Sequence, residues 1–201
     1  MNRFDELTSG DVILYSGKHP LHLRQKNVTG CRWSQVGLVL RLPNNPFAFI
    51  FESTKLSSCC DSIIGEIVHG VQIARLDDRI DNFEGKVAVR QIWPRLSKSS
   101  MLKLCCFVQE VHGRPFNASK WTAARAFRRR NAPHDGSSFF CSELVAEAFQ
   151  RIGLLPMPPS GVSSNNYIPA DFSSEYPSSI LTLPIGYCLS TERLLPPATS
   201  I

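Results

Sequence analysis

Three features that would define other classes of protein are missing from this sequence. It has no run of about eighteen apolar residues, so we expect no transmembrane helix. Its N-terminus, MNRFDELTSGD, mixes charges of both signs and lacks the apolar stretch of a secretory signal peptide. No CxxC pair occurs, and the five histidines do not stand at metal-ligand spacing from cysteines, which argues against a structural zinc site. We therefore predict a cytoplasmic protein that carries no metal and no cofactor.

The cysteines also point to a reducing compartment. They are odd in number, two pairs are vicinal, and no signal peptide accompanies them. This pattern indicates free thiols and not a disulfide framework. The seven are Cys31, Cys59, Cys60, Cys105, Cys106, Cys141 and Cys188.

What the sequence does contain is enough for one folded domain. It has 201 residues, of which 43% are apolar, so a packed core is expected. The net charge is +5, and the densest basic run is RAFRRR. Two interpretations of this run stay open: contact with a phosphate or anionic lipid surface, or an ordinary solvent-exposed helix face. No nucleic-acid-binding motif accompanies it, so we expect no nucleic acid partner. Its arginines are Arg125, Arg128, Arg129 and Arg130.

Apolar periodicity and turn residues predict alternating strands and helices of short length. We expect strands at residues 12–15, 34–42, 47–54, 66–76 and 86–93, the second and third forming a hairpin. Amphipathic spacing predicts helices at residues 76–83, 97–113, 119–131 and 141–152. Residues 18–31 are predicted as a loop, and residues 55–66 as an irregular or inserted segment. Because strands and helices do not alternate regularly, the predicted fold class is α+β.

The residues after Gly153 differ in composition from those before it. Pro, Ser, Gly and Asn dominate there, with Tyr167, Ile168 and Phe172 as scattered anchoring residues. Such a segment can bury a few side chains but does not build a core of its own. We therefore predict a domain of residues 1–155 and a Pro/Ser-rich segment, 156–201, that wraps the same domain.

The stretch FFCSELVAEAFQRI places Cys141 at the start of a predicted helix. Ser137 and Ser138 can cap that helix, and Gly153 followed by Pro156 ends it. A thiol in the first turn meets unpaired N–H groups and the helix dipole, both of which favour a thiolate. Two interpretations follow: a nucleophile, or a cysteine that packs the helix start.

Several blocks in order resemble the permuted papain-like cysteine hydrolases, and in particular the YiiX-like members of the NlpC superfamily. The blocks are GDVILYSG, SQVGLVL, FIFESTKL, HGVQIARLDD, FFCSELVAEAFQRIGLL and IPADF, and they extend over roughly residues 8–172. The resemblance implies an α+β fold in which a small antiparallel sheet packs against helices. It also implies a circularly permuted order, in which the strand with the catalytic histidine precedes the helix with the cysteine.

The resemblance assigns three site residues. Cys141 matches the nucleophile of the family, Glu52 matches its third polar residue, and position 35 matches its catalytic histidine. This chain has Gln35 at that position. Glutamine forms hydrogen bonds but does not titrate near neutral pH, so it cannot move a proton as a histidine does.

None of the five histidines stands out as a replacement base. His134 is nearest to Cys141 in sequence, and the others, His19, His22, His69 and His112, fall on predicted connections or on the 66–76 strand.

Three functions therefore remain open. The first is a cysteine hydrolase or acyltransferase, impaired by Gln35, that acts on an amide or (thio)ester bond of a peptide or lipid. The second is an inactive relative that binds a peptide, acyl chain or protein partner in the cleft of Cys141. The third is a purely structural use of the fold.

Overall fold

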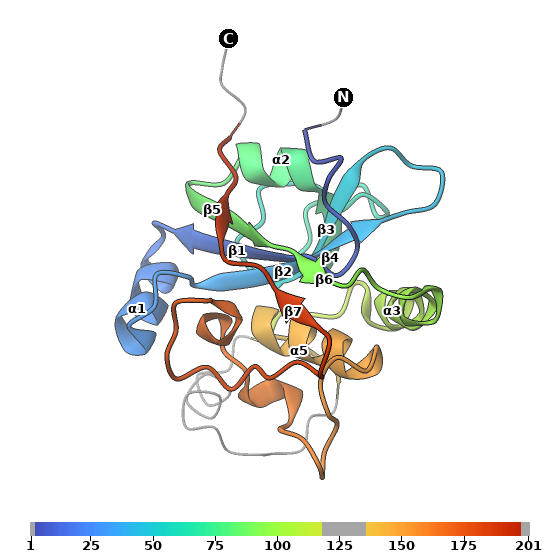
Figure 1. Cartoon of the computed structure of the whole chain (residues 1–201). Coiled ribbons are helices and arrows are strands. Elements are labelled where there is room, and N and C mark those ends of the chain that lie inside the picture. Colours follow the sequence, from blue (N-terminus) through green and yellow to red (C-terminus); the bar gives the residue numbers. More distant parts are fainter. Residues whose placement is uncertain (1–2, 118–135, 198–201) are drawn as a thin grey trace.

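The computed structural model of the chain describes residues 3–117 and 136–197. A six-stranded sheet forms its centre, in the order β4-β3-β2-β1-β5-β8, and every neighbouring pair is antiparallel (Figure 1). A second, two-stranded sheet pairs β6 with β7. The strands are β1 (Val12–Gly17), β2 (Gln35–Arg41), β3 (Ala48–Thr54), β4 (Gly70–Arg75), β5 (Gly85–Arg90), β6 (Ile92–Trp93), β7 (Cys188–Leu189) and β8 (Arg193–Leu194).

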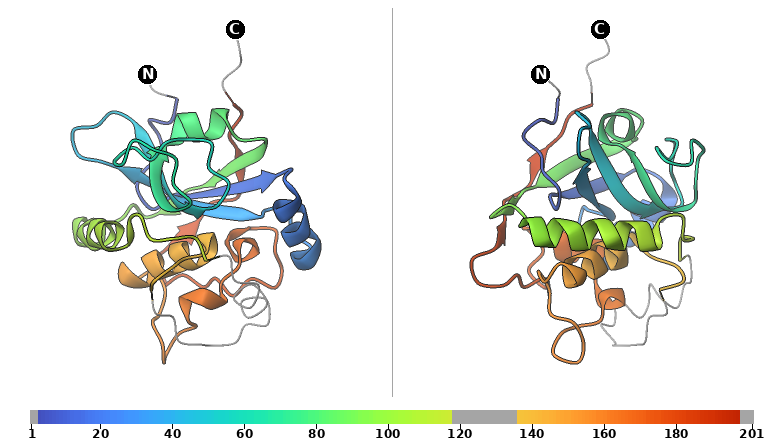
Figure 2. Two further views of the ribbon diagram at one scale, coloured as in Figure 1. Left: turned by 180° about the vertical axis from the view of Figure 1, so that it is seen from behind. Right: turned by 90° about the vertical axis from the view of Figure 1, so that its right-hand side faces the viewer.

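Helices cover both faces of the central sheet. Figures 1 and 2 show α2 (Leu76–Asp81) on one face, and α5 (Cys141–Arg151) with α3 (Lys98–Val111) on the other. Helix α1 (Pro20–Thr29) lies beside the end of β1, and two 3-10 turns, η1 (Ser164–Asn166) and η2 (Pro169–Phe172), follow α5. Together with the antiparallel sheet, this arrangement confirms the predicted α+β class.

The core consists of two apolar layers separated by the sheet. Along β2, Val36 and Leu38 belong to the layer beneath α5, whereas Val39 belongs to the layer beneath α2. The same alternation places Phe51 of β3 in the α5 layer and Ile50 in the α2 layer. Both faces of these central strands are buried, which explains why their sequences are almost continuously apolar. We refer below to the α5 layer and the α2 layer.

The prediction of a loop at residues 18–31 is wrong, because α1 occupies most of it. The ring nitrogen Nδ1 of His19 accepts a hydrogen bond from the N–H of Leu21 at the helix start, where Pro20 fits well. Gly30 ends the helix with a φ of 69°, a conformation that glycine adopts easily. His22 is the one buried residue of α1, so the helix lacks the apolar stripe by which helices are recognised in sequence.

Other boundaries differ less from the predicted ones. The predicted 86–93 strand is split into β5 and β6, and the predicted 66–76 strand begins only at Gly70. Gly70 lies so close to the next segment that a Cβ would come within 2.2 Å of the carbonyl oxygen of Arg114. The predicted 97–113 helix is confirmed as α3, with Ser97 as its N-cap residue. The predicted 119–131 helix and the arginines of the RAFRRR run lie outside the described residues.

The segment after Gly153 contributes to the cores described above. Tyr167, Ile168 and Phe172 are buried in the α5 layer, and Leu195 is buried in the α2 layer. The Arg90 guanidinium donates to the carbonyl oxygens of Phe172, Leu189 and Ser190, which ties β5 to this segment. The division into residues 1–155 and 156–201 stays a prediction. Within the described residues, no helix is both long and apolar enough to cross a lipid bilayer.

Candidate functional site

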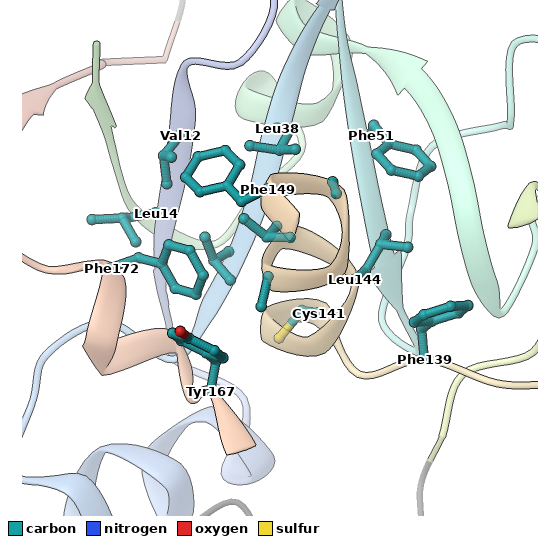
Figure 3. Packing of buried hydrophobic residues seen from close by; sticks show 14 of the residues in the cluster. Val12, Leu14, Leu38, Phe51, Phe139, Cys141, Leu144, Phe149, Tyr167 and Phe172 are labelled. Carbon is teal, nitrogen blue, oxygen red and sulfur yellow. The ribbon is translucent and has the colours of Figure 1, made fainter. Parts of the chain in front are cut away.

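Cys141 is the first residue of α5. Phe140 is the N-cap residue, so the predicted cap at Ser137 or Ser138 is wrong, and the Glu143 carboxylate accepts a hydrogen bond from the Phe140 N–H at 3.0 Å. Figure 3 shows the Cys141 side chain in the first turn of the helix, between Phe139 and Tyr167. The side chain belongs to the α5 layer and is 6% exposed.

The thiol of Cys141 is held in its protonated form by burial. Burial is the largest influence and raises the pKa of Cys141 to about 11, and the charge of Glu52 acts in the same direction. The backbone N–H groups of Val36 and Ser142 lie against the sulfur and lower the pKa, but by less. The expectation that the helix start favours a thiolate is therefore wrong here, because desolvation outweighs the helix N–H groups.

Gln35 and Glu52, predicted from separate strands, are in direct contact. Nε2 of Gln35 donates to Oε2 of Glu52 at 2.5 Å. The other carboxylate oxygen, Oε1, accepts from Nε2 of Gln72 at 2.9 Å and from Nε of Arg79 at 2.6 Å. Glu52 and Gln72 are completely buried, and Arg79 and Gln35 are nearly so. Because three donors and one full positive charge surround the carboxylate, its burial is compensated.

This polar cluster and the thiol lie in different layers. Arg79 comes from α2, and its guanidinium stacks over the ring of Tyr15, a residue of the α2 layer. Glu52 alternates along β3 with Phe51, which faces α5, so the carboxylate points towards α2. The structure thus brings Gln35 and Glu52 together, but Cys141 approaches β2 from the α5 side and contacts its main chain at Val36.

Two members of the cluster, Gln72 and Arg79, were not predicted from the sequence. Arg79 lies between Leu76 and Ile80 on the buried side of α2, where an arginine needs an acidic partner. The place of Arg79 among apolar residues is the only indication of a buried ion pair that the sequence offers. It does not identify Glu52 as the partner. Gln72 lies directly opposite Glu52 in the β3–β4 pairing, a relation that depends on strand register.

The described histidines have other partners. Nδ1 of His22 lies 2.8 Å from Oγ of Ser34, and burial lowers the pKa of His22 to about 4, so its ring is neutral at pH 7. Nε2 of His112 lies 2.8 Å from Oδ2 of Asp61. His19 caps α1, as described above, and His69 is exposed. His134 lies outside the described residues.

An open pocket of about 380 Å³ lies elsewhere, between the end of β5 and the C-terminal segment. Arg90, Asp171 and the serines Ser173, Ser174 and Ser179 form its polar part, and the pocket does not include Cys141. The two Asp171 oxygens are already engaged by the N–H groups of Ile168 and Ile180. Its apolar and aromatic lining consists of Tyr176, Leu181, Leu183, Tyr187 and Leu189.

Comparison with solved structures shows a known fold. The chain is similar to the crystal structure of the metalloprotein YiiX from Escherichia coli O157:H7 (DUF1105), with a TM-score of 0.52 and 19% sequence identity. The match covers 73% of this chain and 66% of that one, so the chain spans just under two thirds of the length of YiiX. At this level of identity the similarity is one of fold, and the YiiX-like fold predicted from the sequence is confirmed. No family model and no curated protein matches the chain.

The described residues do not offer a metal site in the polar cluster. YiiX is described as a metalloprotein. In residues 3–117 and 136–197 no group of three or more His, Cys, Asp or Glu side chains is arranged to hold a metal ion. Both oxygens of Glu52 are occupied by N–H donors, and the Arg79 guanidinium would repel a cation beside them. We therefore do not assign a metal ion to Glu52 on the basis of the similarity to YiiX.

Proposed function

We propose that this protein is a member of the permuted papain-like, NlpC-type fold that binds a ligand without turning it over. In this proposal Cys141 keeps the position of the family's nucleophile, and Gln35 replaces its catalytic histidine. The fold similarity to YiiX supports the architecture, and the chemistry of the two residues supports the loss of turnover.

The observation that carries the proposal is the raised pKa of Cys141. With a pKa of about 11, only about one thiol in 10⁴ is ionised at pH 7. The thiolate is the nucleophile in cysteine chemistry, and a buried thiol needs a base to form it. The Gln35 amide cannot act as that base, and its Nε2 already donates to Glu52.

The pocket beside Arg90 offers space for the ligand. Its leucines supply apolar surface, and Arg90, Asp171 and three serines supply polar groups at its lining; the serines are Ser173, Ser174 and Ser179. This combination suits an acyl chain or a short peptide with a polar or carboxylate end. We expect Leu183→Glu to weaken binding of a fluorescent fatty acid about tenfold or more, measured by titration. Leu102→Glu, at an exposed site on α3, is the control and should leave the affinity unchanged.

A second candidate, an impaired hydrolase or acyltransferase, is favoured by one observation. The N–H groups of Val36 and Ser142 are directed at the sulfur, and such donors also stabilise the oxyanion of acyl transfer. Under this alternative, a local rearrangement on ligand binding would expose the Cys141 thiol and lower its pKa.

Iodoacetamide labelling between pH 6 and 9 distinguishes the two candidates. We expect Cys141 to react more slowly than the exposed Cys60 at pH 7, and its rate to rise about tenfold per pH unit without levelling off. A fast rate at pH 6–7 that levels off would identify an activated nucleophile and overturn the proposal.

Gln35→His is the complementary test. We expect the variant to hydrolyse an activated thioester no faster than the parent, because position 35 faces Glu52 in the α2 layer. A gain of about 10²-fold or more, the usual value of general acid–base catalysis, would favour the hydrolase.

A further inference from the structure

An aliphatic side chain stands fully in solvent on the loop that leads into β7. Ile185 is completely exposed, and it is the second residue of a β-turn that is closed by a hydrogen bond from the Tyr187 N–H to the carbonyl oxygen of Pro184 at 3.0 Å. Gly186 follows with a φ of 92°, a conformation that glycine adopts easily. The turn therefore holds the isoleucine in a fixed place and does not bury it.

The pocket described above begins at the base of the same turn. Leu183 and Tyr187, on either side of the turn, both line it, and so does the exposed Cys188. Trp93 is 55% exposed and lies directly opposite Cys188 in the β6–β7 pair, so the two side chains point to the same side. We call Trp93, Leu183, Ile185, Tyr187 and Cys188 the β7 face. Its loop lies in front of α5 in Figure 1 and at the left edge of the right-hand view in Figure 2.

The loop of the β7 face has no charge. Between Glu175 and Glu192 the sequence contains no Asp, Glu, Lys, Arg or His. The two glutamates at its ends already have partners, since Glu175 is paired with Arg32 and Glu192 accepts hydrogen bonds from two serines. The cores of protein interfaces are depleted of charged residues and enriched in aromatic ones. The composition of the β7 face is therefore that of a contact surface.

The polar groups that line the pocket are bonded within the protein. Both oxygens of Asp171 accept from main-chain N–H groups, and the Arg90 guanidinium donates to three carbonyl oxygens. The serines of the pocket donate to the Glu192 carboxylate or to the carbonyl oxygen of Asp171. An aliphatic side chain can thus enter the pocket without taking partners away from these groups.

From this arrangement we propose that two copies of the chain form a dimer through the β7 face, in which Ile185 of each copy enters the pocket of the other. The projecting side chain and the pocket lie next to each other on one face, so a two-fold axis between them brings both contacts together. A second copy supplies both complementary parts at once. The uncharged loop has no charge by which to select a different protein. The dimer uses the pocket to which a ligand was assigned above, but it does not depend on that function.

The dimer should be weak and reversible. A stable interface takes roughly 20–30 residues from each copy, more than the β7 face and the rest of the pocket provide. Sedimentation equilibrium of the full chain should therefore show a shift from monomer to dimer between about 1 and 200 μM. A parent chain that stays monomeric over this whole range overturns the proposal.

Ile185→Ser removes the projecting side chain from both copies. We expect it to weaken self-association about 100-fold or more, since two contacts are lost and each contributes about tenfold or more. The variant should fold like the parent, because Ile185 has no contact to lose in the monomer. Leu102→Ser changes an exposed leucine of α3 and should leave the association constant unchanged. A dimer that persists in Ile185→Ser would show that another surface joins the copies.

Mixing two variants tests the reciprocal contact itself. Leu183→Glu blocks the pocket and keeps Ile185, so alone it should self-associate as poorly as Ile185→Ser. In the mixed dimer one intact isoleucine meets one intact pocket, so the mixture should associate about tenfold more tightly than either variant alone. A mixture that associates no better than its components would contradict insertion of Ile185 into the pocket.

Ligand binding is measured separately from the dimer. Ile185→Ser leaves the pocket lining intact, so it should bind a fluorescent fatty acid at least as tightly as the parent, whereas Leu183→Glu should lose both ligand and dimer. If Ile185→Ser binds the fatty acid and the parent does not self-associate, the dimer is wrong and the proposed function stands. If the parent dimerises as described and no variant binds the fatty acid, the dimer stands and the ligand assignment is wrong.

Discussion

Glu52 is a completely buried carboxylate, and three side chains donate hydrogen bonds to it. Gln35 lies on the neighbouring strand, Gln72 on the other neighbour, and Arg79 on α2. The cluster therefore connects four consecutive elements of the chain, β2, β3, β4 and α2. Cys141, by contrast, is buried against backbone N–H groups, among them those of Val36 and Ser142, and burial raises the pKa of its thiol. The side chains of Gln35, Gln72 and Arg79 thus direct their hydrogen bonds at Glu52. They are better suited to fixing the fold than to activating the Cys141 thiol.

Removal of the Arg79 charge should strongly destabilise the protein. We expect Arg79→Met to lower the free energy of unfolding by about 3–5 kcal/mol, because the Glu52 carboxylate stays buried without its cation. The double variant Arg79→Met, Glu52→Met should recover a large part of that loss, since no charge is then buried. Urea unfolding of the parent, both single variants and the double variant measures the coupling.

The exposed pair of Arg193 and Glu6 provides a control for that experiment. It has a similar distance, 2.7 Å, but both side chains are about half exposed. Arg193→Met should therefore change the free energy of unfolding by about 1 kcal/mol or less. Equal losses in Arg79→Met and Arg193→Met would contradict the view that burial makes the Glu52 pair important.

At the scale of elements, the segment between β3 and β4 is held by one buried carboxylate. Oδ1 of Asp61 accepts from the N–H groups of Ile63 and Ile64, and Oδ2 accepts from Ile73 of β4 and from His112 after α3. Burial alone would raise the pKa of Asp61, but these donors together hold it below its usual value. The segment predicted as irregular is therefore fixed to two elements by a specific set of hydrogen bonds.

Asp61 should make the stability of this segment depend on acidity. Its pKa is lowered on folding, so the stabilisation is complete above the unfolded pKa, near 3.8, and is lost as the pH falls through the folded value. Asp61→Asn removes one acceptor oxygen and should cost about 1–3 kcal/mol at pH 7. Hydrogen exchange should then accelerate at the amides of Ile63, Ile64 and Ile73. Unchanged exchange at these amides in the variant would show that the carboxylate is not what holds the segment.

The sequence predicts elements best where their apolar residues face the core. Strands β2 and β3 are apolar on both faces because both are buried, and the hairpin between them follows from that pattern. Helix α1 could not be predicted from such a pattern, because its aliphatic residues Leu21, Leu23 and Val28 face solvent and not the core. Gln35 and Glu52 were assigned from a resemblance, and the β2–β3 hairpin brings them together. Arg79 could not be paired with Glu52, because that contact depends on how α2 packs on the sheet.

At the scale of the whole molecule, the C-terminal segment closes both apolar layers. Tyr167 and Phe172 pack beneath α5, Leu195 packs beneath α2, and β8 extends the central sheet beyond β5. Figure 1 shows this segment in orange and red, passing from the α5 side of the sheet to the side of α2. Contacts of this kind join the last forty or so residues to the same cores as the first part of the chain.

A chain that ends at residue 155 should consequently fail to fold cooperatively. It would leave the α5 layer without Tyr167, Ile168 and Phe172, and β5 without its outer partner. In the full chain, Phe172→Ala should lower the free energy of unfolding by about 3–5 kcal/mol, because the ring is completely buried and leaves a cavity. Ile185→Ala, in the same segment but fully exposed, should change it by about 0.5 kcal/mol or less. If the shortened chain instead unfolds in a single sharp transition with the stability of the parent, residues 1–155 form the domain alone and the C-terminal segment only covers it.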